Sequence, residues 1–522
     1  MEKINWPSID SNHLVVYPKQ MLELENDMFS RGMPEESLME KVGIVISQWL
    51  LNRKKLLNNG VTIVIGPGHN GGDGAVIARE LFLKGVSVNV WTPLPIKKKL
   101  TIKHLNYITS IGVEKLKKAP DPKINDLWID AILGNNQKRG VNKDLISLFN
   151  EKFIQRFGKI ISIDVPTGLC PKSGKPFDKN AIKANITLAV GLKKIGILQD
   201  TALPFVGKIH NINIGFTQEK LVNVPQKILS ISYKDVKNLN LSLPSKNSTK
   251  YKRGRTLLIV GSEKYPGAAY LALQGAIASG AGIIKTMLPD VVANSIWRSA
   301  PEIIIQDTLC QSSEGNSLIY EALKRNNLNK FDSILIGPGI GVDVQDWEKS
   351  IGSLLGFKGL LILDADALNR IARSELRKEF FLERKNNTWI TPHFNEFLRL
   401  FPHIEGINNV ELAFNSAKNL DLKILLKGAH SVIADSKGKV WQLYGTNPCS
   451  ARAGLGDLLS GFIAGMSAME ISAGTTISSE SFAKYVLLHS FSASNCRRGS
   501  NASAIGNELS KITKKIKTRQ MS

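Results

Sequence analysis

The chain has 522 residues, of which 43% are hydrophobic and 22% charged, the balance of a globular protein with two or three domains. This composition excludes collagen-like and disordered chains, and no run of about 18 apolar residues predicts a membrane span. Lys and Arg (68) exceed Asp and Glu (45), for a formal charge of +23. Such an excess either favours polyanionic partners or is simply solvated, and no single block of the sequence concentrates it.

The cysteines and the N-terminus indicate the compartment. Cys170, Cys310, Cys449 and Cys496 share no C-x-x-C spacing, which argues against a disulfide framework and against a zinc site of that type. Free thiols fit a reducing cytosol. The N-terminus carries Glu2 and lacks an apolar core segment, so no signal peptide is predicted. We therefore expect a cytoplasmic protein.

The first half of the chain predicts an α/β domain. Short β-branched runs alternate with stretches of helical period, which indicates a parallel sheet with crossover helices. A helical opening at about residues 17–56 precedes the strands, and Gly32-Met33-Pro34 should divide it into two helices. The predicted strands are residues 61–65, 86–90, 127–129, 160–163 and 186–190.

The second half restarts the same class of fold. A polar stretch at residues 239–252 predicts an exposed connection, and the domain boundary is expected between about 218 and 250. We assign residues 1–225 to a Rossmann-like three-layer αβα domain and residues 226–522 to a second αβα domain. The strands predicted in the second half are residues 255–261, 333–336, 360–363, 388–391, 423–426 and 431–434.

A glycine-rich segment, GPGHNGGDG at residues 66–74, lies between the first predicted strand and a helix. It contains G-x-G-x-x-G, where backbone N–H groups can face an anion. Pro67 removes one donor, however, and the next strand ends without an acidic residue for a ribose, which argues against an NAD site of the Rossmann type. The glycines alone indicate a tight turn, but Asn70 and Asp73 can also bind a hydroxyl or a hard cation.

Aspartates follow two further strands, in DAILG at residues 130–134 and in DVPTG at residues 164–168. The carboxyl ends of parallel strands converge on the binding crevice of an open sheet, so Asp73, Asp130 and Asp164 are expected in one pocket. A single aspartate at a strand end is more often a helix cap. Three of them beside glycine loops favour a binding site.

These three segments, in this order and after a helical opening, resemble the N-terminal domain of the YjeF family, the NAD(P)H-hydrate epimerases, over about residues 10–218. The resemblance implies that Asp164 is the acid–base group and that Asn70, Asp130 and Thr167 bind K⁺. His69 stands where the family usually has Asn, and an imidazole replaces one amide hydrogen bond but not both. The implied substrate contacts are His69, Asn70, Gly71, Gly72, Asp73, Asp164 and a phosphate loop of Gly134, Asn135, Asn136, Gln137, Lys138, Arg139 and Gly140.

A second glycine segment ends the string NPCSARAGLGD at residues 447–457 and precedes an apolar stretch of helical character. Glycines before a helix let N–H groups converge on a phosphate, and Asp457 behind them can take a proton from an attacking hydroxyl. An anion site formed by glycines and followed by an aspartate base, G-x-G-D, is typical of ribokinase-like phosphoryl transfer. A glycine-rich helix start explains the same string equally well. No Walker A loop competes with it.

Five other strand ends in this half carry glycines or ligand-type side chains, more than turn chemistry requires. They are GSEKYPGAA at residues 261–269, IGPGIG at 336–341, DADALN at 364–369, TPHFNE at 391–396 and KGAH at 427–430. Together with G-x-G-D they resemble the YjeF C-terminal domain, the ADP/ATP-dependent NAD(P)H-hydrate dehydratase of ribokinase-like fold, over about residues 235–505.

This second resemblance implies a division of roles. Ala268, Gly339, His393 and the base Asp457 would contact the hydrate, and Mg²⁺ would bridge the phosphates of ADP. Two positions depart from the family: Leu455 replaces a Thr of its Gly-Gly-Thr-Gly-Asp, and Asn395 replaces the Gly of its TPHxGE. The residues expected to hold the nucleotide are Lys427, Gly428, Ala429, His430, Ser431 and Gly456.

The two resemblances imply a bifunctional repair enzyme for hydrated nicotinamide cofactors. The first domain would interconvert R- and S-NAD(P)HX, and the second would dehydrate the S form with ADP, giving AMP and phosphate. We expect small-molecule partners, no nucleic acid, no membrane, and a homo-oligomer. One alternative is a ribokinase-type vitamin or small-molecule kinase with an accessory nucleotide-binding domain. Another, indicated only by the charge, is a nucleotide-sensing or RNA-binding protein.

Overall fold

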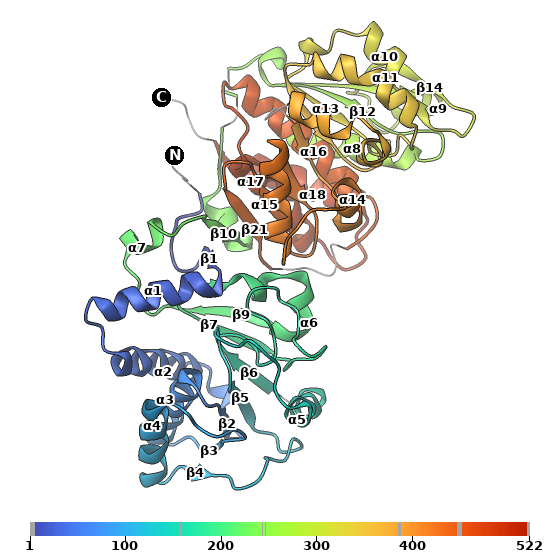
Figure 1. Ribbon diagram of the computed structural model, residues 1–522. Coiled ribbons are helices and arrows are strands. Elements are labelled where there is room, and N and C mark those ends of the chain that lie inside the picture. The colour runs from blue at the N-terminus through green and yellow to red at the C-terminus, as the bar shows by residue number, and fades with distance from the viewer. Residues whose placement is uncertain are drawn as a thin grey trace. The chain divides into compact units, whose positions relative to one another are not determined.

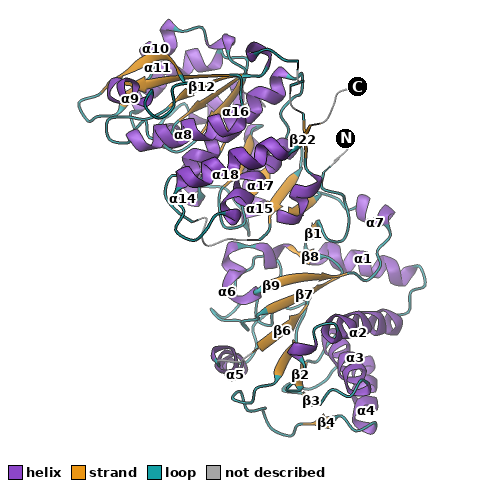
Figure 2. Ribbon diagram, turned by 180° about the vertical axis from the view of Figure 1, so that it is seen from behind, coloured by secondary structure: helices purple, strands orange, loops and turns teal. Residues whose placement is uncertain are grey.

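The computed structural model describes residues 6–155, 159–242, 244–245, 247–384, 388–445 and 451–518. The described residues cluster into two compact units. Ile9–Lys227 form the N-terminal unit, and the described residues outside that range form the C-terminal unit, which includes Trp6 to Ser8. Each unit is built of parallel sheet and helices, as Figures 1 and 2 show, which confirms the predicted α/β class.

The N-terminal unit is organised around a sheet in the order β4-β3-β2-β5-β6-β7-β9. All of its pairings between described residues are parallel. The chain runs from β2 through β3 to β4 on one side and from β5 to β9 on the other, so the strand order reverses between β2 and β5. The strands are β2 (Val61–Ile65), β3 (Val88–Trp91), β4 (Glu114–Lys115), β5 (Leu127–Ala131), β6 (Lys159–Ile163), β7 (Ile186–Val190) and β9 (Lys208–Ile212).

Helices cover both faces of this sheet: α2, α3 and α4 lie on one face and α5 on the other (Figures 1 and 2). The predicted division of the helical opening is confirmed, since α1 ends before Gly32 and Pro34 caps α2. Phe149 of α5 packs edge-on against Trp128, with ring centroids 5.2 Å apart in the core of that face. The helices are α1 (Pro18–Ser30), α2 (Glu35–Leu51), α3 (His69–Leu83), α4 (Lys99–Ser110), α5 (Lys143–Ile154), α6 (Leu203–Val206) and α7 (Gln218–Val222); β1 (Leu14–Val16) pairs with β8 (Lys193–Lys194).

The C-terminal unit has a larger sheet in the order β15-β14-β13-β12-β16-β17-β18-β19-β20-β21-β10. Strands β14 to β19 are parallel, and the order reverses between β12 and β16. Its strands are β10 (Ile228–Ile231), β12 (Arg255–Ile259), β13 (Ile283–Pro289), β14 (Ile304–Gln311), β15 (Ser317–Leu318), β16 (Ser333–Ile336), β17 (Leu360–Leu363), β18 (Thr388–Ile390), β19 (Lys423–Leu426), β20 (Val432–Ala434) and β21 (Val440–Leu443).

Two helices of this unit touch backbone to backbone, α8 (Pro266–Ser279) and α16 (Leu455–Ser472). A Cβ on Gly461 would lie 1.8 Å from the Ala272 carbonyl oxygen, and one on Gly275 would lie 2.0 Å from that of Leu458. Only glycine permits this approach, which fixes the N-terminus of α16 against α8. The other helices are α9 (Asp290–Ile296), α10 (Tyr320–Arg325), α11 (Val344–Leu355), α12 (Asp366–Arg373), α13 (Arg377–Arg384), α14 (Phe394–Leu400), α15 (Asn409–Leu420), α17 (Ser479–Asn495) and α18 (Ala502–Lys515).

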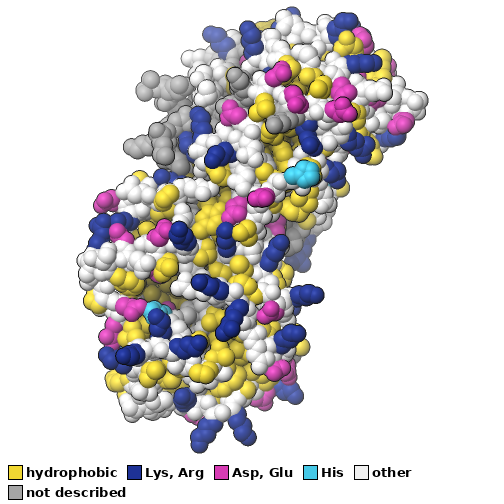
Figure 3. Space-filling model, viewed as in Figure 1, with side chains coloured by type: hydrophobic (Ala, Val, Ile, Leu, Met, Phe, Trp, Pro, Cys, Tyr) yellow, Lys and Arg dark blue, Asp and Glu magenta, His cyan; other side chains and the backbone are white. Residues whose placement is uncertain are grey.

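The positive charge does not gather on one surface. Figure 3 shows Lys and Arg side chains spread over the visible faces of both units rather than in one dense patch. Within the ranges that the structure describes, no helix combines the length and the apolar character needed to cross a bilayer.

Candidate active sites

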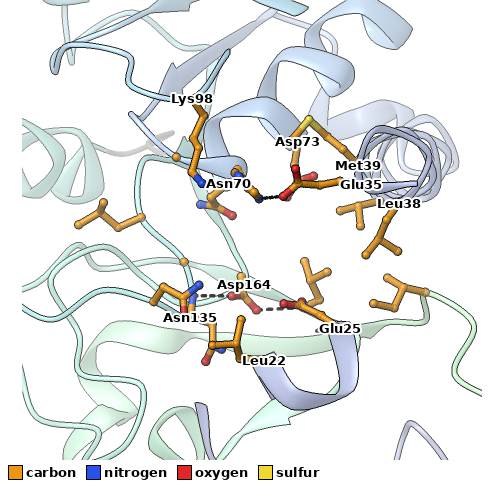
Figure 4. A pocket seen from close by; sticks show the side chains of 18 of the residues that line it. Leu22, Glu25, Glu35, Leu38, Met39, Asn70, Asp73, Lys98, Asn135 and Asp164 are labelled. Atoms are coloured by element: carbon orange, nitrogen blue, oxygen red, sulfur yellow. Dashed lines mark hydrogen bonds and ion pairs between the residues drawn. The ribbon is translucent and has the colours of Figure 1, made fainter. Parts of the chain in front are cut away.

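A cavity of about 490 Å³ opens where the strand order of the N-terminal sheet reverses. Its walls come from α1, α2, the start of α3 and the loops that follow β5, β6 and β7. Figure 4 shows Asp164 and Glu25 on one side of the cavity and Asp73 and Glu35 on the other. The structure therefore brings Asp73 and Asp164 together as expected, whereas Asp130 is not among the lining residues.

Asp164 is held tightly in this cavity. Its backbone is left-handed at φ 70°, a conformation that costs a non-glycine residue about 1–3 kcal/mol and is concentrated at functional sites. One carboxylate oxygen accepts a hydrogen bond from the Asn135 backbone N–H at 2.7 Å, and the other accepts one from Val190 N–H at 3.3 Å and forms an ion pair with Lys194. The Lys194 side chain is only 1% exposed, and sequence reasoning did not find it.

Two further carboxyl groups in the cavity have no such partners. Among the described residues, none forms a hydrogen bond or ion pair with the side chain of Glu25 or Asp73. Burial raises the pKa of Glu25 to about 7, an effect that Lys194 reduces and Asp164 reinforces. Burial, Asp164 and Glu25 together raise the pKa of Asp73 well above its ordinary value. The cavity therefore holds two carboxyl groups that keep their protons to a higher pH than an ordinary carboxyl does.

The predicted HNGGD contacts divide into cavity and packing residues. His69 lines the cavity, and its Nδ1 lies 3.1 Å from Glu35 Oε1. Burial lowers the pKa of His69, Glu35 opposes this, and Lys98 adds to it. The Asn70 side-chain nitrogen is buried in the cavity wall without a partner among the described residues. Gly71 and Gly72 do not line the cavity and are buried in α3.

The loop at residues 134–140 is tied to its surroundings by two side chains. Asn135 Nδ2 donates to the Pro18 carbonyl at 3.0 Å, and the buried Asn135 Oδ1 is left without a partner in the described part of the chain. Gln137 accepts from Gly168 N–H and donates to the Pro166 carbonyl. The two basic residues of the loop, Lys138 and Arg139, are exposed and stand outside the cavity lining, as does Gly140.

The predicted K⁺ ligands are all oxygen donors, as a hard cation prefers, and two of them are in contact. Asp130 is fully buried and accepts from Thr167 Oγ1 at 2.7 Å, Ser162 Oγ at 2.8 Å, Thr167 N–H at 2.9 Å and Ile132 N–H at 3.2 Å. Burial raises the pKa of Asp130, and the hydrogen bonds, which lower it, only partly offset this effect. A carboxylate has about four acceptor positions, so a cation here must displace at least one donor.

The C-terminal site also lies where its sheet order reverses. The loops after β12 and β16 meet there, because Gly261 N–H donates to the Pro338 carbonyl at 2.7 Å. A Cβ on Gly339 would lie 2.7 Å from the Ala268 Cβ, so the structure places these two predicted substrate contacts face to face.

Lys427 links the anion site to a strand end. Its Nζ lies 2.7 Å from Asp364 Oδ1, and a Cβ on Gly456 would lie 3.4 Å from that Nζ. Burial lowers the pKa of Lys427, but the carboxylates of Asp364 and Glu396 outweigh it and raise that pKa. The expected nucleotide contacts Lys427 and Gly456 are thus adjacent at the N-terminus of α16, where a helix favours an anion.

Asp457 lies in the first turn of α16, behind the left-handed Gly454. Its carboxyl forms no hydrogen bond or ion pair with any described residue. Burial raises the pKa of Asp457 to about 7, with Asp364 reinforcing and Lys427 reducing the shift. Such a group is well suited to exchange a proton near neutral pH.

The remaining expected contacts also have local structural roles. His393 caps α14: its Nδ1 accepts from Asn395 N–H at 3.1 Å and Glu396 N–H at 3.3 Å. In the turn before β20, Ser431 Oγ lies 3.1 Å from the Gly428 carbonyl oxygen, and Ala429 occupies the same turn. The His430 ring lies parallel to the Tyr444 ring, 6.4 Å away.

The two departures from the family pattern have different surroundings. Leu455 is 5% exposed and packs in an apolar cluster with Leu458, Ala493 and Ile505. Asn395 is exposed in the first turn of α14, where an ordinary helical backbone accepts a side chain. Residues 447–450 of the predicted G-x-G-D string lie outside the described residues.

Comparison with known proteins gives matches for both halves. A family model described as YjeF-related protein N-terminus matches residues 35–196, and one described as NAD(P)H-hydrate dehydratase matches residues 256–515. A solved structure of an ADP/ATP-dependent NAD(P)H-hydrate dehydratase from Bacillus subtilis, co-crystallised with ATP and Mg²⁺, aligns at 25% identity with a TM-score of 0.43, over 54% of this chain and 96% of its own.

Two curated relatives align along most of the chain. The bifunctional NAD(P)H-hydrate repair enzyme Nnr of Synechocystis sp. is 34% identical over 459 residues, covering 87% of this chain and 85% of its own length. The protein of the same name from Gloeobacter violaceus is 34% identical over 458 residues, covering 85% and 87%. With both resemblances confirmed, this chain belongs to the family of bifunctional NAD(P)H-hydrate repair enzymes.

Proposed function

We propose that this protein repairs hydrated NADH and NADPH with two separate sites. The N-terminal unit interconverts the R and S epimers at C6 of the nicotinamide ring, and the C-terminal unit dehydrates the S epimer. The observation that carries the proposal is that one chain of this family holds, in each unit, a carboxyl with no hydrogen-bond partner among the described residues beside a Lys–Asp ion pair: Glu25 in the N-terminal cavity and Asp457 in the first turn of α16. Fusion fits the chemistry, because a dehydratase for one epimer alone leaves part of the damaged pool unrepaired.

Dehydration begins with Asp457 as the base. It takes the proton of the 6-hydroxyl while that oxygen attacks the terminal phosphoryl group of ADP, and AMP leaves. The backbone at Gly456 and the Lys427 ammonium stabilise the negative charge on the phosphoryl oxygens. The ring nitrogen lone pair then expels phosphate with the electrons of the C6–O bond, and loss of a proton from C5 restores the dihydronicotinamide.

Mg²⁺ would reduce the charge of the nucleotide phosphates when it is bound. Within the described ranges, no group of three or more His, Cys, Asp and Glu side chains is placed to hold a metal ion. We therefore expect this ion to be held by the phosphates of ADP rather than by a protein cage.

The N-terminal site is suited to a ring that gains positive charge as its hydroxyl departs. Asp164, oriented by Lys194, faces the cavity and stabilises such a cation electrostatically. Asn70, Asp130 and Thr167 would hold K⁺, whose charge would favour substrate phosphates in the neighbouring loop. Because Asp130 already accepts four hydrogen bonds, we expect this ion to bind weakly.

The test is an assay of purified protein on mixed NADHX epimers, with ADP and ATP tested separately and K⁺ exchanged for Na⁺. The proposal expects ADP-dependent loss of both epimers, with AMP and phosphate formed in equal amounts. Loss of the S form alone would remove the epimerase assignment, and a stable phosphorylated product would favour a small-molecule kinase. We expect a homo-oligomer, which light scattering on the same sample measures.

A further inference from the structure

Glu25 lines the N-terminal cavity, although no motif of the sequence indicated it. It projects from α1 into the cavity beside Asp164, as Figure 4 shows. Three contacts fix the helix that carries it: Asn135 Nδ2 donates to the Pro18 carbonyl at 3.0 Å, Gln20 Nε2 donates to the Pro225 carbonyl at 2.9 Å, and the Met21 side chain is fully buried. Glu25 is therefore held at a defined place in the wall.

The charges around Glu25 set it apart from Asp164. Asp164 is occupied by Lys194 and two backbone N–H groups, whereas no described residue forms a hydrogen bond or ion pair with the Glu25 carboxyl. The charged groups that face Glu25 most directly are Lys194, Asp164 and Asp73. The other charged or titratable groups of the cavity wall are Glu35, His69 and Lys98.

The buried Lys194 ammonium pairs with Asp164 and acts on Glu25, whereas the charges that act on Asp73 are those of Asp164 and Glu25, so the three carboxyls cannot all be ionised without a large desolvation cost. Asp164 has the ion pair, which leaves the proton to Glu25 and Asp73. Glu25 lies on the same side of the cavity as Asp164, opposite Asp73 (Figure 4). A ring bound between the two sides would therefore meet a proton-bearing carboxyl on each face.

We propose that Glu25 is a catalytic acid of the epimerisation, an inference that rests on the proposed function of the N-terminal unit. Glu25 donates its proton to the 6-hydroxyl, the C6–O bond breaks, and the ring nitrogen lone pair forms the C6–N1 double bond as water leaves. Water then adds to C6 from the opposite face and loses a proton to a cavity carboxylate. The return of a proton to Glu25 closes the cycle with no oxidant, reductant or other co-reactant.

The test compares Glu25→Gln with Glu23→Gln. Glu23 lies on the same helix but is 58% exposed, and exposed Lys19 is its ion-pair partner. Glu23→Gln therefore makes the same chemical change at a residue that does not line the cavity. We expect E25Q to slow conversion of R- to S-NADHX by about 10²- to 10⁴-fold, the usual contribution of a positioned acid or base. ADP-dependent loss of S-NADHX, measured on the same sample, should stay unchanged, and E23Q should match the wild type in both.

The pH profile and the melting temperature separate a catalytic from a structural role. Wild-type epimerisation should fall as the pH rises through about 7, where Glu25 loses its proton, and the residual rate of E25Q should lose this inflection. The variant should melt no lower than the wild type, because it removes a buried ionisable group. Glu25→Asp, which keeps the carboxyl, should recover part of the rate.

Two results would overturn the inference while leaving the epimerase assignment intact: E25Q that epimerises at the wild-type rate, or E25Q that is slow but keeps the wild-type pH inflection. Absence of R-to-S conversion in the wild type itself would instead remove the proposed function of the N-terminal unit.

Discussion

The two candidate sites contain the same combination of groups, a Lys–Asp ion pair and a third carboxyl, on different secondary-structure elements. In the N-terminal unit the Lys194–Asp164 pair faces Glu25, and in the C-terminal unit the Lys427–Asp364 pair is close to Asp457. In both, the third carboxyl has no hydrogen-bond partner among the described residues, and burial raises its pKa to about 7. The ammonium reduces that shift and the paired aspartate reinforces it in each case.

The difference lies in what stands beside the unpaired carboxyl. Asp457 is in the first turn of a helix, next to glycines and Lys427, where a phosphate is stabilised. Glu25 is in the middle of α1, and the charged groups that face it are the Lys194 ammonium and the carboxyls of Asp164 and Asp73. In the mechanism we propose, one arrangement of charge would supply a proton acceptor for phosphoryl transfer in the C-terminal unit and a proton donor for loss of a hydroxyl in the N-terminal unit.

The largest expected effect is the loss of dehydration in Asp457→Asn. The amide keeps the shape of the carboxyl but cannot take the hydroxyl proton, so ADP-dependent recovery of NADH should fall by about 10²- to 10⁴-fold while epimerisation persists. Asp290→Asn, an exposed aspartate in the first turn of α9, is the matched control. Near-normal recovery of NADH by D457N would exclude Asp457 as the base.

Breaking the ion pair of the other site should have the next largest effect. Asp164→Asn should reduce R-to-S conversion by about 10²-fold and lower the melting temperature, because removing one partner of a buried pair costs about 3–5 kcal/mol. Replacing both partners, with Lys194→Met added, should restore the melting temperature but not the activity. Epimerisation that returned with stability would mean that Asp164 only supports the fold.

A smaller effect is expected on the pH dependence of dehydration. The base must be ionised, so the rate should rise with pH through about 7 in the wild type. Lys427 lowers the pKa of Asp457, so Lys427→Met should move this rise to higher pH as well as weaken ADP binding. Lys437→Met, at an exposed lysine between β20 and β21, should leave the profile in place. If the pH profile of K427M does not shift, the charge of Lys427 does not act on the pKa of Asp457.

The smallest effect concerns stability. The pKa of Asp457 is raised on folding, so as pH rises above about 4 the unfolded state loses its proton first, and the folded state is progressively disfavoured until the pH passes about 7. D457N should therefore raise the free energy of unfolding at pH 8 by about 1–3 kcal/mol, with no gain near pH 3.5. Urea unfolding at both pH values measures this, and an equal gain at both would contradict the linkage.

Half of the strands that the structure describes were predicted, because their apolar runs are short and most are bounded by glycine or aspartate. Residues 61–65, 186–190, 333–336, 360–363 and 423–426 were predicted with the bounds that the structure shows. Ile283–Pro289 and Ile304–Gln311 were missed: they include polar residues such as Lys285 and Gln306, and β14 lies beside the short edge strand β15, where one face is exposed. The spacing of apolar residues alone does not identify such strands.

The sequence by itself determined the α/β class, the family, the strand-end residues Asp164 and Lys427, and the helix-start residues Gly456 and Asp457, because glycines and charged residues after apolar runs or before a helix mark the carboxyl edge of a parallel sheet. Only the tertiary structure decided which charges meet there. The pairing of Asp164 with Lys194, the enclosure of Asp130 by four donors, and the presence of Glu25 from a helix far upstream depend on packing between elements distant in the chain. The pKa of a carboxyl shifts because of the groups that surround it in the folded protein, and those groups cannot be identified from the residues next to it in the sequence.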